Sequence, residues 1–238
     1  MKQRMMFGTL AVLTGALLAA DLTPKDEVKN AAKALGDKTN YSWHSTVENA
    51  GGGGGGGRGM AGPTDGKTEK DGYTYLTVTR GNNTTEIVLK GDKGAVKTAD
   101  GWQSLADASQ NNNGPGRFIA RMAQNFKAPA AEASDLADKT TAITKADNAY
   151  SGDLTEDGAK SLLTFGRRGG NAPTPTNTKG SVKFWIADGL LSKYQYNVQG
   201  TINFNGNDVN INRTTTVEVK DVGNTKVDVP DEAKQKAT

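Results

Sequence analysis

The stretch 193–220, KYQYNVQGTINFNGNDVNINRTTTVEVK, decides the fold. Apolar and polar side chains alternate along two long runs, and the turn dipeptide Asn205-Gly206 joins them. The apolar positions of the two runs are Tyr194, Tyr196, Val198, Ile202 and Phe204, then Val209, Ile211, Val217 and Val219. A period of two indicates a strand with one buried and one solvated face. The stretch therefore predicts a long antiparallel hairpin whose apolar face is covered.

Further strands are predicted on both sides of the chain's middle. Residues 41–48, 73–80, 84–90 and 94–98 are rich in β-branched or aromatic side chains, with glycine-containing turns between the last three. These four strands predict an antiparallel meander. Val182, Phe184 and Ile186 alternate in the same way just before the hairpin. The chain thus predicts one large antiparallel sheet.

Helices are expected at the start and in the middle of the chain. Thr23 can cap a helix over 24–35, in which Pro24 suits the first position and Gly36 the end. Residues 115–127, 128–138 and 155–163 predict three more helices. These helices are the only elements available to cover the sheet, which makes the fold class α+β.

The first twenty residues have the pattern of a secretory signal peptide. Lys2 and Arg4 precede an apolar run that ends at Ala19-Ala20, and this run is shorter than the roughly 20 residues of a spanning helix. We expect residues 1–20 to be removed and 21–238 to form one exported domain without a transmembrane segment, periplasmic or extracellular. The chain has no cysteine, so we expect neither a lipid anchor at the cleavage site nor disulfides.

Composition argues against several functions. The 29 Lys+Arg and 26 Asp+Glu become 27 and 26 once the signal peptide is removed, and the charges are interspersed, which argues against a nucleic-acid partner. The glycine-rich segments 51–62 and 165–180 predict flexible loops inside the domain. The P-loop-like 62–68, GPTDGKT, has the wrong glycine spacing for a phosphate cradle.

The sequence offers few candidate residues for catalysis or metal binding. His44 is the single histidine, and with no cysteine it cannot supply a zinc ligand set. No GxSxG motif accompanies it, so a hydrolase using His44 is the least favoured of three hypotheses. We expect no cofactor, no metal and no enzymatic activity. The aromatic residues of the sheet and helices either form an ordinary core or line an apolar cavity.

The order of elements resembles the LolA/LppX-like superfamily of periplasmic lipoprotein carriers and cell-envelope lipid-binding proteins. The features that carry this resemblance are the amphipathic helix at 24–35, Tyr41-Ser42-Trp43, the Gly101-Trp102 step, the long late strands, and the closing segments Val217-Glu218-Val219-Lys220-Asp221-Val222-Gly223 and Val227-Asp228-Val229-Pro230. The resemblance implies a curved half-barrel with helices on its concave face and an apolar cavity between them for acyl chains.

A ligand site follows from this resemblance. It places an acyl chain against the candidate residues Phe118, Met122, Phe184, Tyr196 and Ile202. Arg213 shares the register of the apolar face, where it lies at a rim, pairs with a carboxylate or binds a ligand head group. The resemblance implies a lipid or lipoprotein partner and leaves the oligomeric state open. The alternative function is a structural or interaction module of the cell envelope with a filled core and no small-molecule ligand.

Overall fold

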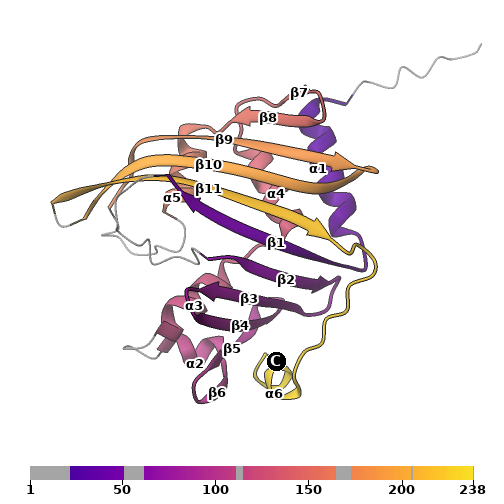
Figure 1. Ribbon diagram of the computed structural model, residues 1–238, viewed down its shortest axis with the longest axis vertical. Coiled ribbons are helices and arrows are strands. Elements are labelled where there is room, and N and C mark those ends of the chain that lie inside the picture. The colour runs from indigo at the N-terminus through magenta and orange to yellow at the C-terminus, as the bar shows by residue number, and fades with distance from the viewer. Residues whose placement is uncertain (1–21, 51–61, 111–114, 165–172, 205, 238) are drawn as a thin grey trace, which may run out of the picture.

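A computed structural model describes residues 22–50, 62–110, 115–164, 173–204 and 206–237 (Figure 1). Its strands form one antiparallel sheet of eleven in the order β6-β5-β4-β3-β2-β1-β11-β10-β9-β8-β7. The bounds are β1 Asn40–Asn49, β2 Thr64–Glu69, β3 Thr74–Arg80, β4 Asn83–Lys90, β5 Lys93–Thr98, β6 Gly101–Ser104, β7 Thr144–Ala146, β8 Ala149–Asp153, β9 Thr176–Ala187, β10 Leu190–Phe204 and β11 Asn207–Lys220. The sheet is open, with β6 and β7 at its two edges.

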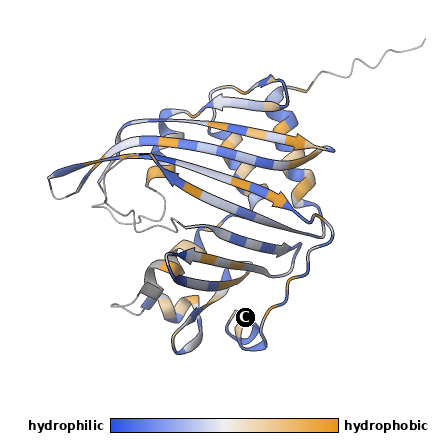
Figure 2. Cartoon of the chain, viewed as in Figure 1, coloured by the Kyte–Doolittle hydropathy of each residue, from blue (hydrophilic) through white to orange (hydrophobic). Residues whose placement is uncertain are grey.

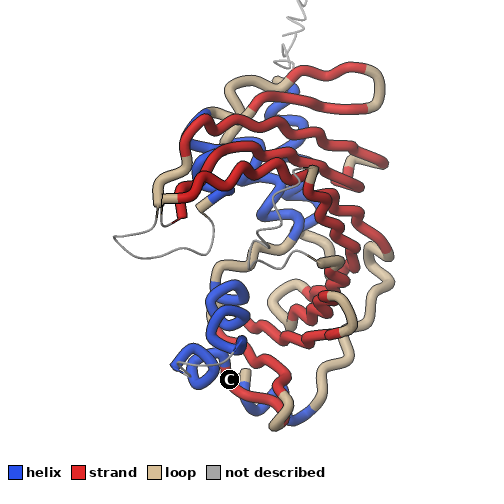
Figure 3. The backbone as a smooth tube through the Cα atoms, turned by 60° about the vertical axis from the view of Figure 1, so that its left-hand side comes forward, coloured by secondary structure: helices blue, strands red, loops and turns tan. Residues whose placement is uncertain are grey.

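The helices fall on both faces of the sheet. Their bounds are α1 Pro24–Gly36, α2 Leu105–Gln110, α3 Pro115–Gln124, α4 Pro129–Asp138, α5 Glu156–Leu163 and α6 Asp231–Lys236. The first five cover the concave face, which we call the inner face (Figure 3). On it α1, α4 and α5 contact β9 or β10, whereas α2 and α3 contact β5. The predicted α+β architecture with a curved sheet and helices on its concave side is confirmed.

The main core lies between the inner face and these helices. Strand register places Phe184 opposite Tyr194 and Tyr196 opposite Thr215, so alternate residues of β9, β10 and β11 point to the same side. Phe184 and Tyr194 are fully buried there, and their rings lie 6.5 Å apart. Figure 2 shows the corresponding alternation of apolar and polar residues along the long strands. The alternation read from 193–220 is therefore the pattern that buries the core.

Trp43 occupies the middle of the inner face. Its ring lies 5.8 Å from that of Tyr41 and stacks on Phe126 at 6.0 Å with an interplanar angle of 16°. Gly66 of β2 pairs with Trp43, and a Cβ at that position would lie 2.6 Å from Cη2 of the indole and closer to two other ring atoms. The indole ring therefore fills the space that a side chain at position 66 would occupy.

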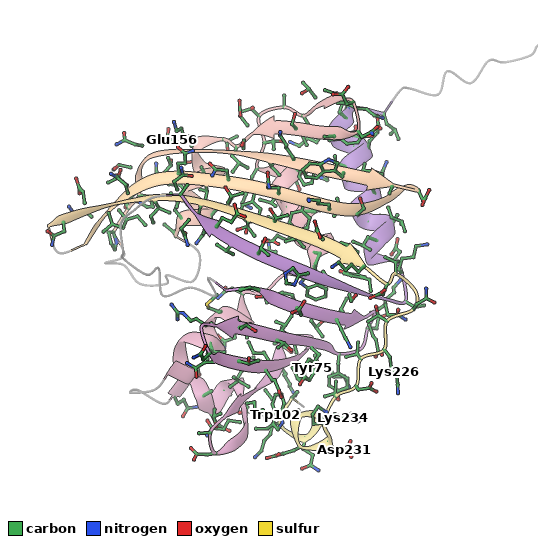
Figure 4. All side chains as sticks on the ribbon, in the orientation of Figure 1. Tyr75, Trp102, Glu156, Lys226, Asp231 and Lys234 are labelled. Carbon is green, nitrogen blue, oxygen red and sulfur yellow. The ribbon has the colours of Figure 1, made fainter. Side chains whose placement is uncertain are left out.

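A second, smaller core lies on the outer face. In β4 and β5, Ile87 pairs with Val96 on the inner side, whereas Val88 pairs with Ala95 on the outer side. The outer pair packs with Trp102 of β6 and with Val229 and Ala233 from the C-terminal segment. Figure 4 shows Trp102 and Tyr75 beside α6. The residues after Pro230, for which no helix was predicted, thus contain a helix that covers the outer face of β5 and β6.

Several boundaries differ from the sequence-based expectations. The P-loop-like segment overlaps β2, which the meander prediction omitted, and β6, β7, β8 and α2 were also not expected. The segment 165–180 is not a loop throughout, because β9 begins at Thr176 and Gly180 packs against Leu154. Thr23 caps α1 as predicted, and its Oγ1 accepts a hydrogen bond from the Asp26 N–H at 3.2 Å. The predicted signal peptide and the glycine run at 51–57 lie outside the described residues.

Candidate functional site

The inner face is not buried evenly. Tyr194, Tyr196 and Val198 are buried, as are Tyr41 and Trp43. Towards the C-terminal end of β1 and the N-terminal end of β11, which lie side by side, the inner-face side chains keep partial exposure even though helices cover this side of the sheet. We call this group the inner-face patch; its members are Ser45, Val47, Val209, Ile211 and Arg213. The patch combines three aliphatic side chains with one cation.

Helix α5 forms an apolar wall beside the inner-face patch. Gly200 of β10 pairs with Ile211, and a Cβ at Gly200 would lie 2.6 Å from Cδ1 of Leu163. This close approach brings the C-terminal end of α5 onto the sheet. Leu162, the preceding residue, packs against the core and is only partly buried, like Ile211. Apolar surface from helix and sheet therefore meets at the patch.

Arg213 lies at the junction between α5 and the sheet. Its Nη2 donates a hydrogen bond to the Leu162 carbonyl oxygen at 3.2 Å. A cation at the C-terminal end of a helix is favourable, because the last carbonyl groups carry partial negative charge. The buried Nε atom has no hydrogen-bond partner, and no carboxylate of the described residues lies within 4.0 Å of the guanidinium. The register predicted for Arg213 is confirmed. Of the three alternatives for its surroundings, a carboxylate partner is not found in this part of the chain.

A partly buried acid lies on α4, on the side that faces the sheet. Glu132 accepts hydrogen bonds from the hydroxyl groups of Tyr194 and, at 3.3 Å, Tyr196. Burial is the largest influence on its carboxyl group and raises the pKa, an effect that the two tyrosine hydroxyls partly offset. Burial also raises the pKa of Tyr41 to about 12. The tyrosines hold α4 on β10 and satisfy the carboxylate that would otherwise be costly to bury.

Glu132 was not among the predicted site residues, although a signal for it exists. It stands three positions after Pro129 and four before Leu136, and both of these are buried residues of α4. Residues with this spacing share one helix face. An acidic residue on the apolar face of an alanine-rich helix was therefore readable from the sequence.

The six predicted site residues do not form one cluster. Phe184, Tyr196 and Ile202 are buried on the inner face of β9 and β10, and Arg213 joins them from β11. Met122 is buried on α3, at the other end of the sheet beside β5. Phe118 belongs to α3, and its side chain lies outside the described part. A site that spans all six residues stays a prediction, because the described residues show no continuous lining from α3 to β10.

Two cavities among the described residues are relevant to a ligand site. One of about 160 Å³ lies under α3, between Leu89, Leu105 and Phe126. The other, of about 520 Å³, is an open groove on the outer face between Tyr73 and the segment Val227–Pro230. None of the predicted site residues whose side chains are described lines either cavity. The first is smaller than the roughly 300–1,000 Å³ of typical small-molecule sites.

His44 lies on the outer face, as its place in the strand predicted. Its Nδ1 lies 2.7 Å from Oδ1 of Asp65, its neighbour on β2, and both side chains are in contact with solvent. On the other side of His44, its cross-strand partner on β11 is Glu218. The Glu218 carboxylate forms an ion pair with Nζ of Lys193 on β10 at 2.9 Å. Within the described residues, no group of three or more His, Cys, Asp or Glu side chains is arranged to hold a metal ion. The His44 pair is thus part of a solvated polar row.

No protein-family model matches the chain, and no curated protein matches it in sequence. The solved structures similar to it include three at 12% identity: the lipoprotein LppX of Mycobacterium tuberculosis (TM-score 0.47, covering 87% of this chain and 98% of that one), LprF of Mycobacterium bovis (0.43, 88% and 97%) and a LolA superfamily protein of Nitrosomonas europaea (0.35, 88% and 96%). None of the helices described in the chain is long and apolar enough to span a membrane.

Proposed function

We propose that the chain is an exported, non-enzymatic binding protein that holds the acyl chain of a lipid or of an acylated partner between its sheet and helices. The inner-face patch is the observation that supports this proposal. Val47 and Ile211 face the helix-covered side, where their cross-strand partners Thr215 and Gly200 are buried, yet they keep partial exposure. Aliphatic surface left open on the covered side of a sheet is a place where an apolar ligand gains contact.

The energetics suit an acyl chain. Each CH₂ group that leaves water contributes about 0.8 kcal/mol, equivalent to about a fourfold gain in affinity. Leu162 and Ile211 offer apolar contact from two sides, and the Glu132 hydroxyl network keeps the adjacent polar groups satisfied without the ligand. The ligand therefore needs to bring apolar length rather than hydrogen-bonding groups to this part of the site.

A chain-length series tests the proposal. Affinities for fatty acids of eight to sixteen carbons, measured by displacement of a fluorescent fatty acid, should rise by up to about fourfold per CH₂. Ile211→Trp fills the patch and should weaken binding, whereas Asn210→Trp, its exposed outer-face neighbour on β11, should leave binding unchanged. Native mass spectrometry of the purified protein should show bound lipid.

One result would end the proposal. If the protein is free of lipid, takes up no fluorescent fatty acid and shows no difference between the two tryptophan variants, the inner face is a filled core. The chain would then be better described as a structural or interaction module of the cell envelope.

A further inference from the structure

Arg213 carries a charge into the covered side of the sheet without a partner of opposite charge. Its neighbours across the strands are Val198 on β10 and Asn49 on β1, neither of which is acidic. A guanidinium group offers five N–H donors, and the Leu162 carbonyl oxygen accepts from one nitrogen. The buried Nε has no acceptor in the described part of the chain.

An unpartnered donor of this kind is costly. A buried polar group without a hydrogen bond loses its hydration and gains nothing in return, and the loss is larger for a charged group. The structure contains a carboxylate on the same face, but Glu132 does not reach the guanidinium. Its two oxygens accept from Tyr194 and Tyr196, and the Tyr196 hydroxyl is close enough to both charges for each to influence its pKa.

The contact with α5 alone does not explain why residue 213 is an arginine. A lysine would supply a cation to the end of α5 equally well, because a helix C-terminus attracts any positive charge. Arginine differs from lysine in its planar fork, which matches the two oxygens of a carboxylate or phosphate. The unpartnered Nε and the bonded Nη2 are the two nitrogens along one edge of that fork.

We propose that Arg213 receives the anionic head group, a carboxylate or phosphate oxygen pair, of an acyl ligand that lies on Val47 and Ile211. This inference rests on the proposed function and specifies the ligand class as an anionic amphiphile rather than a neutral lipid. The ligand supplies the acceptor that Nε lacks, and its chain runs along the aliphatic members of the inner-face patch.

A matched ligand pair separates this inference from the proposed function. Hexadecanoate and hexadecanol have the same chain length and differ in head-group charge at neutral pH. The wild-type protein should bind hexadecanoate about 10- to 100-fold more tightly than hexadecanol, and the preference should shrink as salt is added. Inorganic phosphate, titrated alone as a competitor, should not displace hexadecanoate at equal concentration.

Two substitutions test the residue. Arg213→Gln should reduce the preference for hexadecanoate to about one while leaving hexadecanol affinity within about twofold. Arg80→Gln removes the same charge from an exposed position at the end of β3 and should leave the preference intact. Thermal melts of both variants report any loss of folding, and the wild-type ligand pair remains decisive if Arg213→Gln does not fold.

The outcomes are distinct. Equal binding of acid and alcohol by the wild type, or a preference that survives in Arg213→Gln, would overturn the head-group inference and leave acyl binding in place. Displacement of hexadecanoate by equimolar phosphate would assign the site to a free anion instead. Binding of neither lipid would overturn the proposed function and this inference with it.

Discussion

Gly66→Ala tests the packing at the centre of the sheet. In an extended strand a change from glycine to alanine usually stabilises a protein, by about 0.4–1 kcal/mol, because it restricts the unfolded chain. Gly66 has no positive φ, so its backbone would accept alanine. The new methyl group would instead lie 2.6 Å from Cη2 of Trp43, inside the 3.0 Å that Cβ atoms keep from other heavy atoms. The structure therefore predicts the opposite sign.

The expected loss in free energy of unfolding follows from the contacts that the displaced indole ring would lose. Forcing a side chain out of a packed core costs about 1–3 kcal/mol. Displacing Trp43 also weakens its stacking on Phe126, which is worth about 0.5–1.5 kcal/mol. The sum of about 2–4 kcal/mol corresponds to a fall in Tm of roughly 5–15 °C for a chain of this size.

Denaturant unfolding of a short series measures the effect. Lys67→Ala, at the exposed neighbouring position of β2, is the control and should change stability by less than about 0.5 kcal/mol. Adding Gly66→Ala to a Trp43→Leu background should cost much less than it does alone, since the clash is gone. A stabilised Gly66→Ala variant, or an equal cost in both backgrounds, would show that the indole ring does not fill the space over Gly66.

Two further predictions concern the buried acid and the C-terminal helix. Burial raises the Glu132 pKa above its ordinary 4.5, so the folded state binds this proton more tightly than the unfolded state and loses stability as pH rises through the window above 4.5. Glu132→Gln removes that loss, so the stability of the variant relative to wild type should increase from pH 4 to pH 8 in thermal melts; a constant difference would contradict this. Ala233→Asp buries a charge under α6, which should release the helix and expose Trp102 to acrylamide quenching, whereas Lys236→Asp, exposed on the same helix, should not. Unchanged quenching in Ala233→Asp would mean that α6 does not cover Trp102.

The parts of the fold that sequence predicted are those in which local pattern and burial agree. The alternation of 193–220 and the capped helix after Thr23 belong to this group. Strand β2 does not, because TDGKTE is polar and contains glycine. It is a strand because β1 and β3 pair with it on both sides and because Trp43 needs a neighbour without a side chain.

The candidate site was predicted in part for the same reason. Strand parity placed Arg213 on the inner face, because parity is a local property. Which side chains of that face stay partly exposed depends on where α5 ends and on how closely α5 approaches the sheet at Gly200. Both are set by tertiary packing, which a local sequence pattern does not show. Met122 was grouped with Phe184 as lining of the cavity that the family resemblance implied, but the helix of Met122 contacts β5 and Phe184 lies on β9.

The strand order has a consequence for how the molecule assembles. Each neighbouring pair in the described sheet is consecutive in the chain, except for β1 and β11, in which Trp43 pairs with Val219. Joining strands so distant in sequence requires closing a long loop, which slows folding more than forming local hairpins does. A nascent chain can build both flanks of the sheet early, yet it cannot join them until residue 220 is available. Because Val47 lies on one side of this seam and Arg213 on the other, the inner-face patch comes into being only at that last step. Ligand binding would therefore report that the chain has finished folding.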